Sequence, residues 1–326
     1  MEFMTKQDFL DAVGMKPSEM TIQILTHNDL DGYSSAMVVA DWLLNLGVSR
    51  ESISISHNDY DHAPSIDQLA DAVFITDYSI TNPAFAMSMT EALVELGGAL
   101  IWIDHHQSSI DLCKQDKWKK LTHTRGIRDD SYCATYLVWQ FLHPNEPIPE
   151  FIKLVDDFDC WKLKDPKSKI LAKAFDFYPG FKRDEMGRPY RSLITYEGRG
   201  YLSELLSKGE LYDKALPDIL SGYIRQKGFI GSFKDGEFKD LEFPIINSPG
   251  LGSDSLAKYL DKYKIGCVFF WNGQSFTISF YSKNSGKINA RKICEANGGG
   301  GHPDAAGFTT TSVPFKKVRD IEDLYA

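Results

Sequence analysis

The sequence predicts an α/β fold: an N-terminal parallel-sheet domain with helices on both faces, a helical connector, and a smaller C-terminal α+β domain. In the first half, short apolar strands alternate with helical patterns, which is typical of a parallel sheet. Polar residues directly follow several of these strands, as they do at the carboxyl edge of an open α/β sheet. The 326 residues accommodate two domains. We expect boundaries at 1–165, 166–240 and 241–326.

The first domain is expected to contain four strands. Apolar and polar residues alternate in the first of them, the second is a short strand, and the last two are short apolar runs. The strands cover 21–26, 53–56, 73–76 and 99–103. Apolar residues at helical spacing predict helices over 34–46, 82–97 and 131–142. Gly47 is expected to close the first of these helices.

The second half is expected to change character near residue 241. Before that point the pattern predicts helices over 147–155 and 201–227, separated by a basic, loop-rich stretch over 162–199. After it, strands are predicted over 243–246, 266–270 and 276–281, with helices over 253–262 and 289–296.

Composition narrows the classes of function. The chain has 45 acidic and 36 basic residues, and this net charge of −9 argues against a long, positively charged track for nucleic acid. Local basic groups and metal ions would still bind a short anionic substrate. Five cysteines without a Cys-x-x-Cys pair indicate free thiols in a reducing cytoplasm. We find no signal peptide and no apolar run of about 18 residues, so no membrane partner is expected.

The first candidate site follows the first expected strand. His27, Asp29 and Asp31 are spaced by two residues, so in an extended segment their side chains share one side. Gly32 would allow a tight turn before the helix. These aspartates could instead be ordinary helix caps, but one capping residue suffices, and three metal-ligating groups exceed that need. We therefore favour metal binding.

Two further carboxylates follow expected strands. Asp77 comes directly after the third strand, and Asp104 opens an Asp-His-His triplet with His105 and His106 after the fourth. Each of these residues, taken alone, could have an ordinary structural role instead of a functional one, since such residues also cap helices, pair with neighbours or face solvent. Their common position after strands favours convergence at one edge of the sheet.

A third group of carboxylates follows the apolar pair Leu154 and Val155. It consists of Asp156, Asp157 and Asp159. A solvated helix end would explain it equally well. If one of the three completes a cation site, we choose Asp157, with Asp156 next, although the sequence does not settle this choice.

The number of carboxylates indicates the metal. Four of them at one place must become protonated or find cations, and two divalent ions supply four compensating charges. Such ion pairs act together in phosphoester hydrolysis. Histidine ligands favour Mn²⁺ over Mg²⁺, and the absence of cysteine at these positions disfavours a structural zinc site. We expect two Mn²⁺ ions, with Mg²⁺ or Co²⁺ as substitutes.

These motifs, in this order, resemble the DHH phosphoesterase superfamily, in forms related to RecJ and to oligoribonucleases of the nanoRNase kind. The resemblance includes the associated C-terminal domain with its glycine-rich signature, and it spans residues from about 21 to about 310. The matching motifs are His27-x-Asp29-x-Asp31-Gly32, Asp77, Asp104-His105-His106, Asp156-Asp157 and Gly299-Gly300-Gly301-His302-x-x-Ala305-Ala306-Gly307.

The resemblance implies a role for each site residue. One metal would be held by His27, Asp29 and Asp77, and the other by Asp31, Asp77, His105 and Asp157. Asp104 would orient a ligand histidine, and His106 would contact the scissile phosphate or assist proton transfer. The nucleophile would be a water activated by the two ions.

The resemblance also implies a substrate grip in the C-terminal domain, across an interdomain cleft. Gly299, Gly300 and Gly301 would bring backbone amides close to a phosphate, and His302 and Arg291 would assist. A flexible turn and surface polar residues are the plain alternatives. Family members often carry an arginine where this chain has residues 281–283, Tyr-Ser-Lys, which leaves the identity of the phosphate clamp open.

The function expected from these features is Mn²⁺-dependent hydrolysis of short oligonucleotides or linear dinucleotides to mononucleotides. The alternatives are a RecJ-like single-strand exonuclease, a cyclic (di)nucleotide phosphodiesterase and a pyrophosphatase. A nucleotide-binding protein without activity is the alternative from another class. The sequence does not fix the oligomeric state, and a homodimer is compatible with it.

Overall fold

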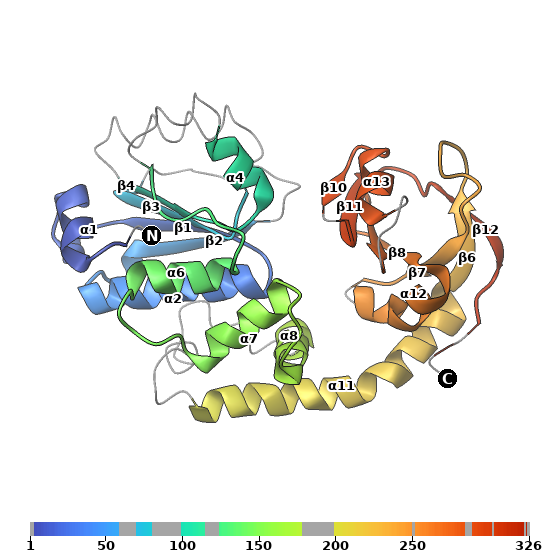
Figure 1. Cartoon of the computed structure of the whole chain (residues 1–326), viewed down its shortest axis with the longest axis horizontal. Helices are drawn as coiled ribbons and strands as arrows, with labels where there is room; N and C mark the ends of the chain where they lie inside the picture. Colours follow the sequence, from blue (N-terminus) through green and yellow to red (C-terminus); the bar gives the residue numbers. More distant parts are fainter. Residues whose placement is uncertain are drawn as a thin grey trace. The chain divides into compact units, whose positions relative to one another are not determined.

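The computed structural model describes residues 3–58, 70–79, 99–114, 124–177, 199–249, 252–283, 289–301, 303–322 and 324 (Figure 1). The chain divides into two compact units, Met1–Tyr212 and Asp213–Ala326. This division lies inside the segment 166–240 that we expected to be a connector, and helix α11 (Arg199–Lys227) runs through it.

The first unit is built on a parallel sheet with the strand order β2-β1-β3-β4-β5. The strands are β1 (Ile22–His27), β2 (Ile53–Asn58), β3 (Ala72–Thr76), β4 (Ala99–Ile103) and β5 (Thr124–Arg125). The register pairs Thr26 with Thr76 and Thr76 with Ile103. Residues 27, 77 and 104 therefore stand at the same edge of the sheet, where a parallel sheet presents its ligand-binding groups.

Helices cover both faces of this sheet, as predicted. The helices of this unit are α1 (Lys6–Val13), α2 (Leu30–Leu46), α4 (Gln107–Cys113), α6 (Ala134–Leu142), α7 (Glu150–Asp159) and α8 (Pro166–Phe177), with short 3-10 turns at Pro17–Glu19 and Arg50–Ser52. The helix expected over 82–97 lies outside the described residues. Phe74 and Ile101 belong to the core that α2 and α6 share, whereas Ile75 and Trp102 pack with Leu112 of α4. Successive strand residues thus serve opposite layers.

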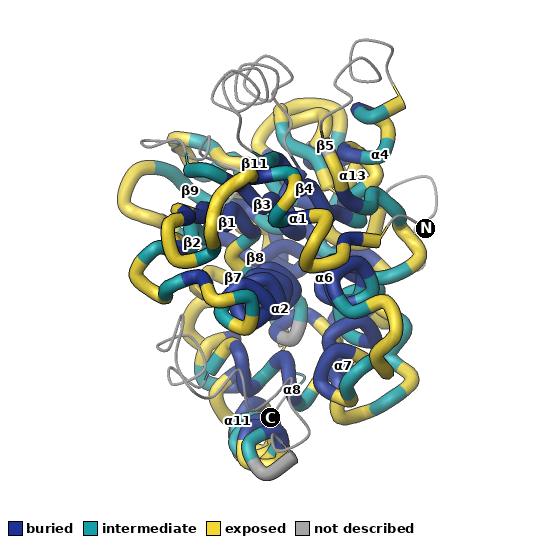
Figure 2. Tube along the Cα trace, turned by 90° about the vertical axis from the view of Figure 1, so that its left-hand side faces the viewer, coloured by how far each residue is buried: buried dark blue, intermediate teal, exposed yellow. Residues whose placement is uncertain are grey.

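Helix α2 is the central helix of the first unit. Every residue from Leu30 to Leu43 is buried, which Figure 2 shows as a dark blue segment. The helix begins at Leu30, so the expected start at residue 34 was too late, and Gly32 lies inside the first turn. A Cβ at Gly32 would lie 2.1 Å from the carbonyl oxygen of His27. Glycine is therefore required by this close approach of β1 and α2.

The second unit contains a seven-stranded mixed sheet in the order β10-β11-β9-β8-β7-β6-β12, in which only β7 and β8 run parallel. Its strands are β6 (Gly228–Phe233), β7 (Phe243–Asn247), β8 (Ile265–Trp271), β9 (Phe276–Ser282), β10 (Gly300–Gly301), β11 (Ala305–Thr310) and β12 (Phe315–Asp320). Helices α12 (Ala257–Tyr263) and α13 (Ala290–Glu295) and a 3-10 turn at Ser253–Leu256 complete it. The prediction missed β6, which lies in the expected connector, and also β10, β11 and β12.

An aromatic cluster fills the core of this sheet. The rings of Phe233, Phe243, Phe280 and Phe315 are buried, with centroids 5.1–6.2 Å apart. Such ring pairs add specific contacts to the burial of a large apolar area. The first unit concentrates its polar groups at one sheet edge, and the second unit has an apolar core of this kind.

Candidate metal centre

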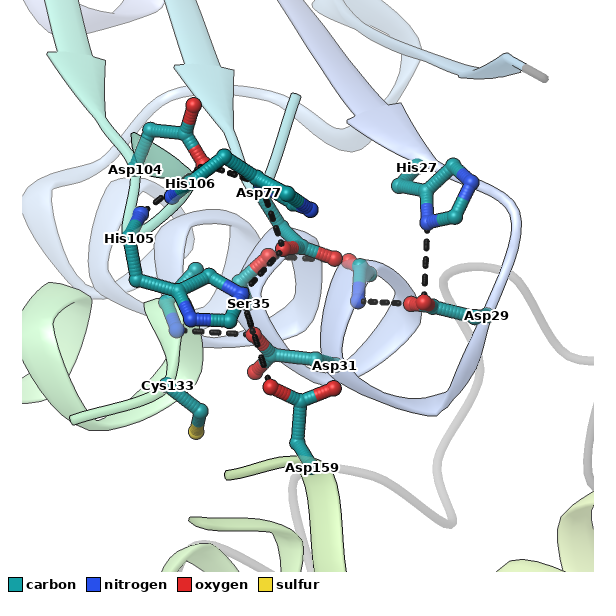
Figure 3. A network of polar contacts seen from close by, with 12 residues as sticks. His27, Asp29, Asp31, Ser35, Asp77, Asp104, His105, His106, Cys133 and Asp159 are labelled. Atoms are coloured by element: carbon teal, nitrogen blue, oxygen red, sulfur yellow. Dashed lines mark hydrogen bonds and ion pairs between the residues drawn. The ribbon is translucent and has the colours of Figure 1, made fainter. Parts of the chain in front are cut away.

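The candidate site lies at the carboxyl edge of the parallel sheet, entirely within the first unit. His27 is the last residue of β1, Asp77 follows β3 and Asp104 follows β4. The sequence separations are large, but the parallel register brings these residues level. Figure 3 shows these side chains turned toward one another, with those of His105, His106 and Asp159.

Asp77 is the central residue of this group. It is 1% exposed, and neither of its carboxylate oxygens accepts a hydrogen bond within the described part of the chain. Burial, together with the nearby charges of Asp31 and Asp29, raises its pKa well above the usual range. Its backbone φ of 51° is in the left-handed region, which non-glycine residues rarely adopt. A strained and buried carboxylate that accepts no hydrogen bond is typical of a functional site.

His105 lies between three carboxylates. Its Nε2 is 3.3 Å from Asp77 Oδ1, 3.4 Å from Asp159 Oδ2 and 3.8 Å from Asp31 Oδ2. Burial lowers the pKa of the imidazole. This effect outweighs the negative charge of Asp31, which by itself would raise that pKa. A neutral imidazole is the form of histidine that ligates metals, so the environment of His105 suits a ligand.

His27 and Asp29 form the second side of the group. His27 Nδ1 lies 2.8 Å from Asp29 Oδ2, and Asp29 Oδ1 accepts a hydrogen bond of 2.9 Å from the amide of Gly32. Burial raises the pKa of Asp29, but the hydrogen bond and charge of His27 outweigh it and lower the pKa overall. Asp29 is thus the N-cap of α2, the alternative that the sequence left open, while it also faces His27 and Asp77.

Asp31 is held firmly by the start of another helix. Its two oxygens accept hydrogen bonds from the amides of Ala134 (2.7 Å) and Thr135 (2.8 Å), in the first turn of α6. Thr135 Oγ1 in turn donates to the carbonyl of Asp31 (2.9 Å). A carboxylate oxygen accepts more than one interaction, so Asp31 is fixed in place and still able to ligate a cation.

Asp104 orients the second histidine of the triplet. Its Oδ1 lies 2.7 Å from His106 Nδ1 and accepts the amide of His105 at 2.8 Å, while Ser109 Oγ donates to Oδ2. Burial alone would lower the pKa of His106, but the hydrogen bond and charge of Asp104 raise it. Asp104 is fully buried, and its carboxylate contacts His106 and the neighbouring amide and serine.

The structure does not bring Asp157 to the site. Its Oδ1 accepts the amide of Lys164 at 2.9 Å and its Oδ2 the amide of Asp165 at 3.1 Å, so it fixes the loop after α7. Asp156, our second choice, accepts the amide of Cys133 (3.0 Å) and pairs with Lys162 Nζ (2.6 Å). These contacts correct our choice of Asp157 as the metal ligand, and of Asp156 as the next candidate.

Asp159 occupies the place that we assigned to Asp157. Burial and the charge of Asp31 raise its pKa well above the usual range, and its Oδ2 is buried without a hydrogen bond in the described part of the chain. Helix α7 extends to Asp159, four residues past its expected end. Asp159 follows the buried Ile152 and Val155 at helical spacing, and this signal could have identified it.

The donor set fits divalent cations. The atoms that His27, Asp29 and Asp77 offer lie within 4.8 Å of one another, and so do those of Asp77, His105 and His106. The two groups share Asp77, whose buried oxygens lack hydrogen-bond donors within the described residues. Carboxylate oxygens and imidazole nitrogens suit Mn²⁺ and related ions. The observed grouping differs from our assignment in placing His106 among the candidate ligands.

The glycine-rich residues of the second unit form the short strand β10. Gly301 has a φ of +136°, and a Cβ at Gly299 would lie 2.1 Å from the carbonyl oxygen of Gly307. These glycines are therefore required for the approach of β11. Arg291 Nε lies 2.7 Å from Glu295 Oε1 on α13. Gly300 lies in the same strand as Gly301, and His302 lies outside the described residues. Binding of a phosphate at these positions stays a prediction.

Comparison with known proteins finds a family match in the first unit. Residues 21–155 match the DHH family, N-terminal domain. The chain thus resembles the DHH family over this segment. Its Asp104-His105-His106 triplet lies in the matched segment, together with His27, Asp29, Asp31 and Asp77. This agreement confirms the family resemblance for the first unit.

Three proteins that are similar to this chain are informative. An uncharacterized protein of Acanthamoeba polyphaga mimivirus is 22% identical over 238 residues, which are 70% of this chain and 52% of that protein. The chain thus spans about half the length of this curated relative. The structure of the DHH domain of a member of the s1p family of ribosomal proteins matches with a TM-score of 0.57 and 15% identity, covering 88% of this chain and 82% of that one.

The third relative is RecJ in complex with Mn²⁺ from Thermus thermophilus. It matches with a TM-score of 0.54 and 16% identity, covering 93% of this chain and 51% of that chain. At such low identity the two structural matches show a shared fold.

Among the described residues, no helix has the length and apolar character that crossing a membrane requires.

Proposed function

We propose that this protein is a metal-dependent phosphodiesterase that hydrolyses short oligonucleotides or linear dinucleotides to mononucleotides. The observation that supports it most directly is Asp77, which is buried, without a hydrogen bond among the described residues, and shared by two groups of ligating side chains. A carboxylate that bridges two cations is a recurrent element of phosphoester hydrolysis. The DHH family of the first unit agrees with this chemistry.

The roles of the residues follow from their contacts. His27 and Asp29 would hold one cation, and His105, Asp31 and Asp159 would hold the second. Asp77 would contribute to both. When bound, the ions would supply an activated water and neutralise charge that develops on the phosphate. Asp31 is fixed by two amides and Asp29 by one, so the chain presents these ligands in preset positions.

His106 would act on the substrate. The Asp104 carboxylate fixes the imidazole through Nδ1, so a contact with a phosphate or a leaving oxygen falls to Nε2. Asp104 also favours the charged form of the ring, which would stabilise negative charge or deliver a proton to the leaving group. Asp104 is thus a positioning residue, and His106 is the proposed catalytic residue.

Mn²⁺ is the cation that we propose, with Mg²⁺ or Co²⁺ as substitutes. Two or more imidazoles in the donor set favour a transition metal over Mg²⁺, which prefers oxygen. The related RecJ structure is a complex with Mn²⁺. We also propose a reducing cytoplasm as the location, because all five cysteines are free thiols.

The preference for short substrates rests on charge. The net charge of −9 disfavours binding along a long polyanion, whose affinity depends on many cationic contacts. Residues 299–302 and Arg291 would grip a terminal phosphate, which remains a prediction from the sequence. No contact of the described residues favours the other substrate classes.

A substrate panel with Mn²⁺ tests the proposal. The metal-free protein is given Mn²⁺ and linear dinucleotides, five-residue oligonucleotides, long single-stranded DNA, cyclic dinucleotides or pyrophosphate. We expect mononucleotides from the first two substrates, and loss of this activity in Asp77→Asn. Asp157→Asn is the matched control, since that carboxylate binds loop amides outside the ligand groups.

Each other outcome contradicts a stated part of the proposal. Hydrolysis of only the long DNA would indicate a single-strand exonuclease, and hydrolysis of only cyclic dinucleotides or pyrophosphate would indicate those activities. Tight nucleotide binding without turnover would indicate a binding protein. Equal activity in the wild type and Asp77→Asn would overturn the metal assignment.

A further inference from the structure

A cysteine lies beside the candidate metal centre, and the proposed hydrolysis does not use it. Cys160 directly follows α7 and is half-buried. The ligating atoms of Cys160, Asp159 and His105 lie within 4.8 Å of one another. A thiol, a carboxylate and an imidazole thus converge at one place, on the side of His105 that faces α7.

Two observations indicate that this group has room for a cation. Asp159 Oδ2 is buried and accepts no hydrogen bond within the described residues, although His105 Nε2 lies 3.4 Å away. Cys160 Sγ contacts Asp156 Oδ1 at 3.6 Å, a weak interaction that a metal–sulfur bond would readily replace. The group therefore contains a carboxylate oxygen that lacks a hydrogen bond and a thiol that is only weakly held.

The donor types of this group differ from those around Asp77. His27, Asp29 and Asp77 offer only nitrogen and oxygen, which suit Mn²⁺. Sulfur, nitrogen and oxygen together suit Zn²⁺ and its heavier relative Cd²⁺, which accept three protein ligands and keep a fourth position for water. Mn²⁺ and Mg²⁺ gain little from a sulfur ligand, so the thiol discriminates between the two classes of ion.

We propose that His105, Asp159 and Cys160 form a site for a thiophilic divalent cation, Zn²⁺ or Cd²⁺, that overlaps the proposed Mn²⁺ centre through His105 and Asp159. On binding, the S–H bond of Cys160 breaks, a sulfur–metal bond forms, and the proton leaves to solvent without a change of oxidation state. Because the Nε2 atom of His105 can bind only one ion at a time, thiophilic cations and Mn²⁺ compete.

Cadmium is the probe that tests this site, because its bond to a thiolate produces an ultraviolet charge-transfer band. The metal-free full-length chain is titrated with Cd²⁺ and the band is recorded. We expect a band that saturates at one thiolate per chain and is lost in Cys160→Ser. Cys113→Ser is the matched control, since Cys113 is also half-buried but does not belong to the group. This control should keep the full band.

Two further measurements keep the test decisive if Cys160→Ser folds poorly. Asp159→Asn retains the thiol and should shift the titration to Cd²⁺ concentrations at least tenfold higher. Excess Mn²⁺ should shift the wild-type titration in the same direction. A band that persists in Cys160→Ser, or that neither Asp159→Asn nor Mn²⁺ alters, would overturn the proposal. The readout does not require hydrolysis, so its failure is separate from failure of the proposed phosphodiesterase activity.

Discussion

The two compact units bury polar side chains in different ways. The described part of the first unit buries six aspartates, which are Asp31, Asp41, Asp77, Asp104, Asp156 and Asp157. In the described part of the second unit, the only buried polar side chains are serines. A buried carboxylate is costly unless it is paired or hydrogen-bonded, whereas a serine hydroxyl is easily satisfied by a nearby carbonyl.

The two units differ in how far the burial of their polar groups is compensated by hydrogen bonds. Asp31, Asp104, Asp156 and Asp157 have backbone or side-chain partners, so their burial is compensated. Asp77 accepts no hydrogen bond among the described residues, and it belongs to two groups of side chains that could hold a metal ion. The described part of the aromatic core of the second unit contains no buried carboxylate, so it does not carry this free-energy cost. Changes at Asp77 and in that core should therefore have opposite effects.

The largest effect is expected for Asp77→Asn. Without a bridging carboxylate, hydrolysis should fall by roughly 10²–10³-fold or more, the order that follows from losing one charge-stabilising group. The metal-free variant should nevertheless be more stable than the wild type at neutral pH, because an amide does not carry the free-energy cost of ionising or protonating a carboxyl group buried beside other carboxylates. Asparagine also tolerates the left-handed backbone at this position.

Thermal unfolding with and without Mn²⁺ measures this prediction. The wild type should be stabilised by Mn²⁺ and the variant should not. A metal-free variant that is less stable than the wild type would show that Asp77 contributes to the fold independently of a cation.

The next effect is expected in the second unit. Phe280→Ala removes a fully buried ring that lies 5.1 Å from Phe243, and it should lower the free energy of unfolding by about 3–5 kcal/mol. Trp271→Ala, at a half-exposed ring, is the control and should cost much less. Calorimetry should show a lowered transition for Phe280→Ala while stabilisation of the first unit by Mn²⁺ persists. Loss of that stabilisation would mean that the two units are not independent.

A smaller effect is expected for Asp104→Asn. Asparagine cannot reproduce the charged contact with His106 Nδ1, so activity should fall by roughly 10–100-fold, as for residues that orient a functional histidine. The pH–rate profile should change as well, because Asp104 raises the pKa of His106. The basic limb should move to lower pH, since the ring would lose its proton earlier. A fall in activity with an unchanged profile would argue for a merely structural role.

The smallest effect separates two neighbouring aspartates. Asp157→Ala leaves the amides of Lys164 and Asp165 without their acceptor, which should cost about 1–3 kcal/mol of stability. Mn²⁺ should still stabilise this variant in thermal unfolding. Asp159→Ala should instead lose much of that response, because Asp159 Oδ2 faces His105. The reverse pattern would restore Asp157 as the metal ligand.

Much of this organisation could be predicted from the sequence. Apolar strands followed by polar residues identified the sheet edge, because parallel strands end level whatever their separation along the chain. His27, Asp77 and His105 were found in this way. The distinction between Asp157 and Asp159 could not be predicted securely, because it depends on where α7 ends and how the following loop turns. Strand β6 was missed because its glycines, Gly228 and Gly231, weaken the strand pattern.

The attachment of Asp31 to α6 has a consequence for regulation. The carboxylate is tied to the amides of Ala134 and Thr135, so its position follows any displacement of that helix along its axis. A substitution or small molecule that shifts α6 from its far end would move one cation ligand without touching the sheet edge. Affinity for the ion would then be adjustable at a distance, with every ligand residue intact.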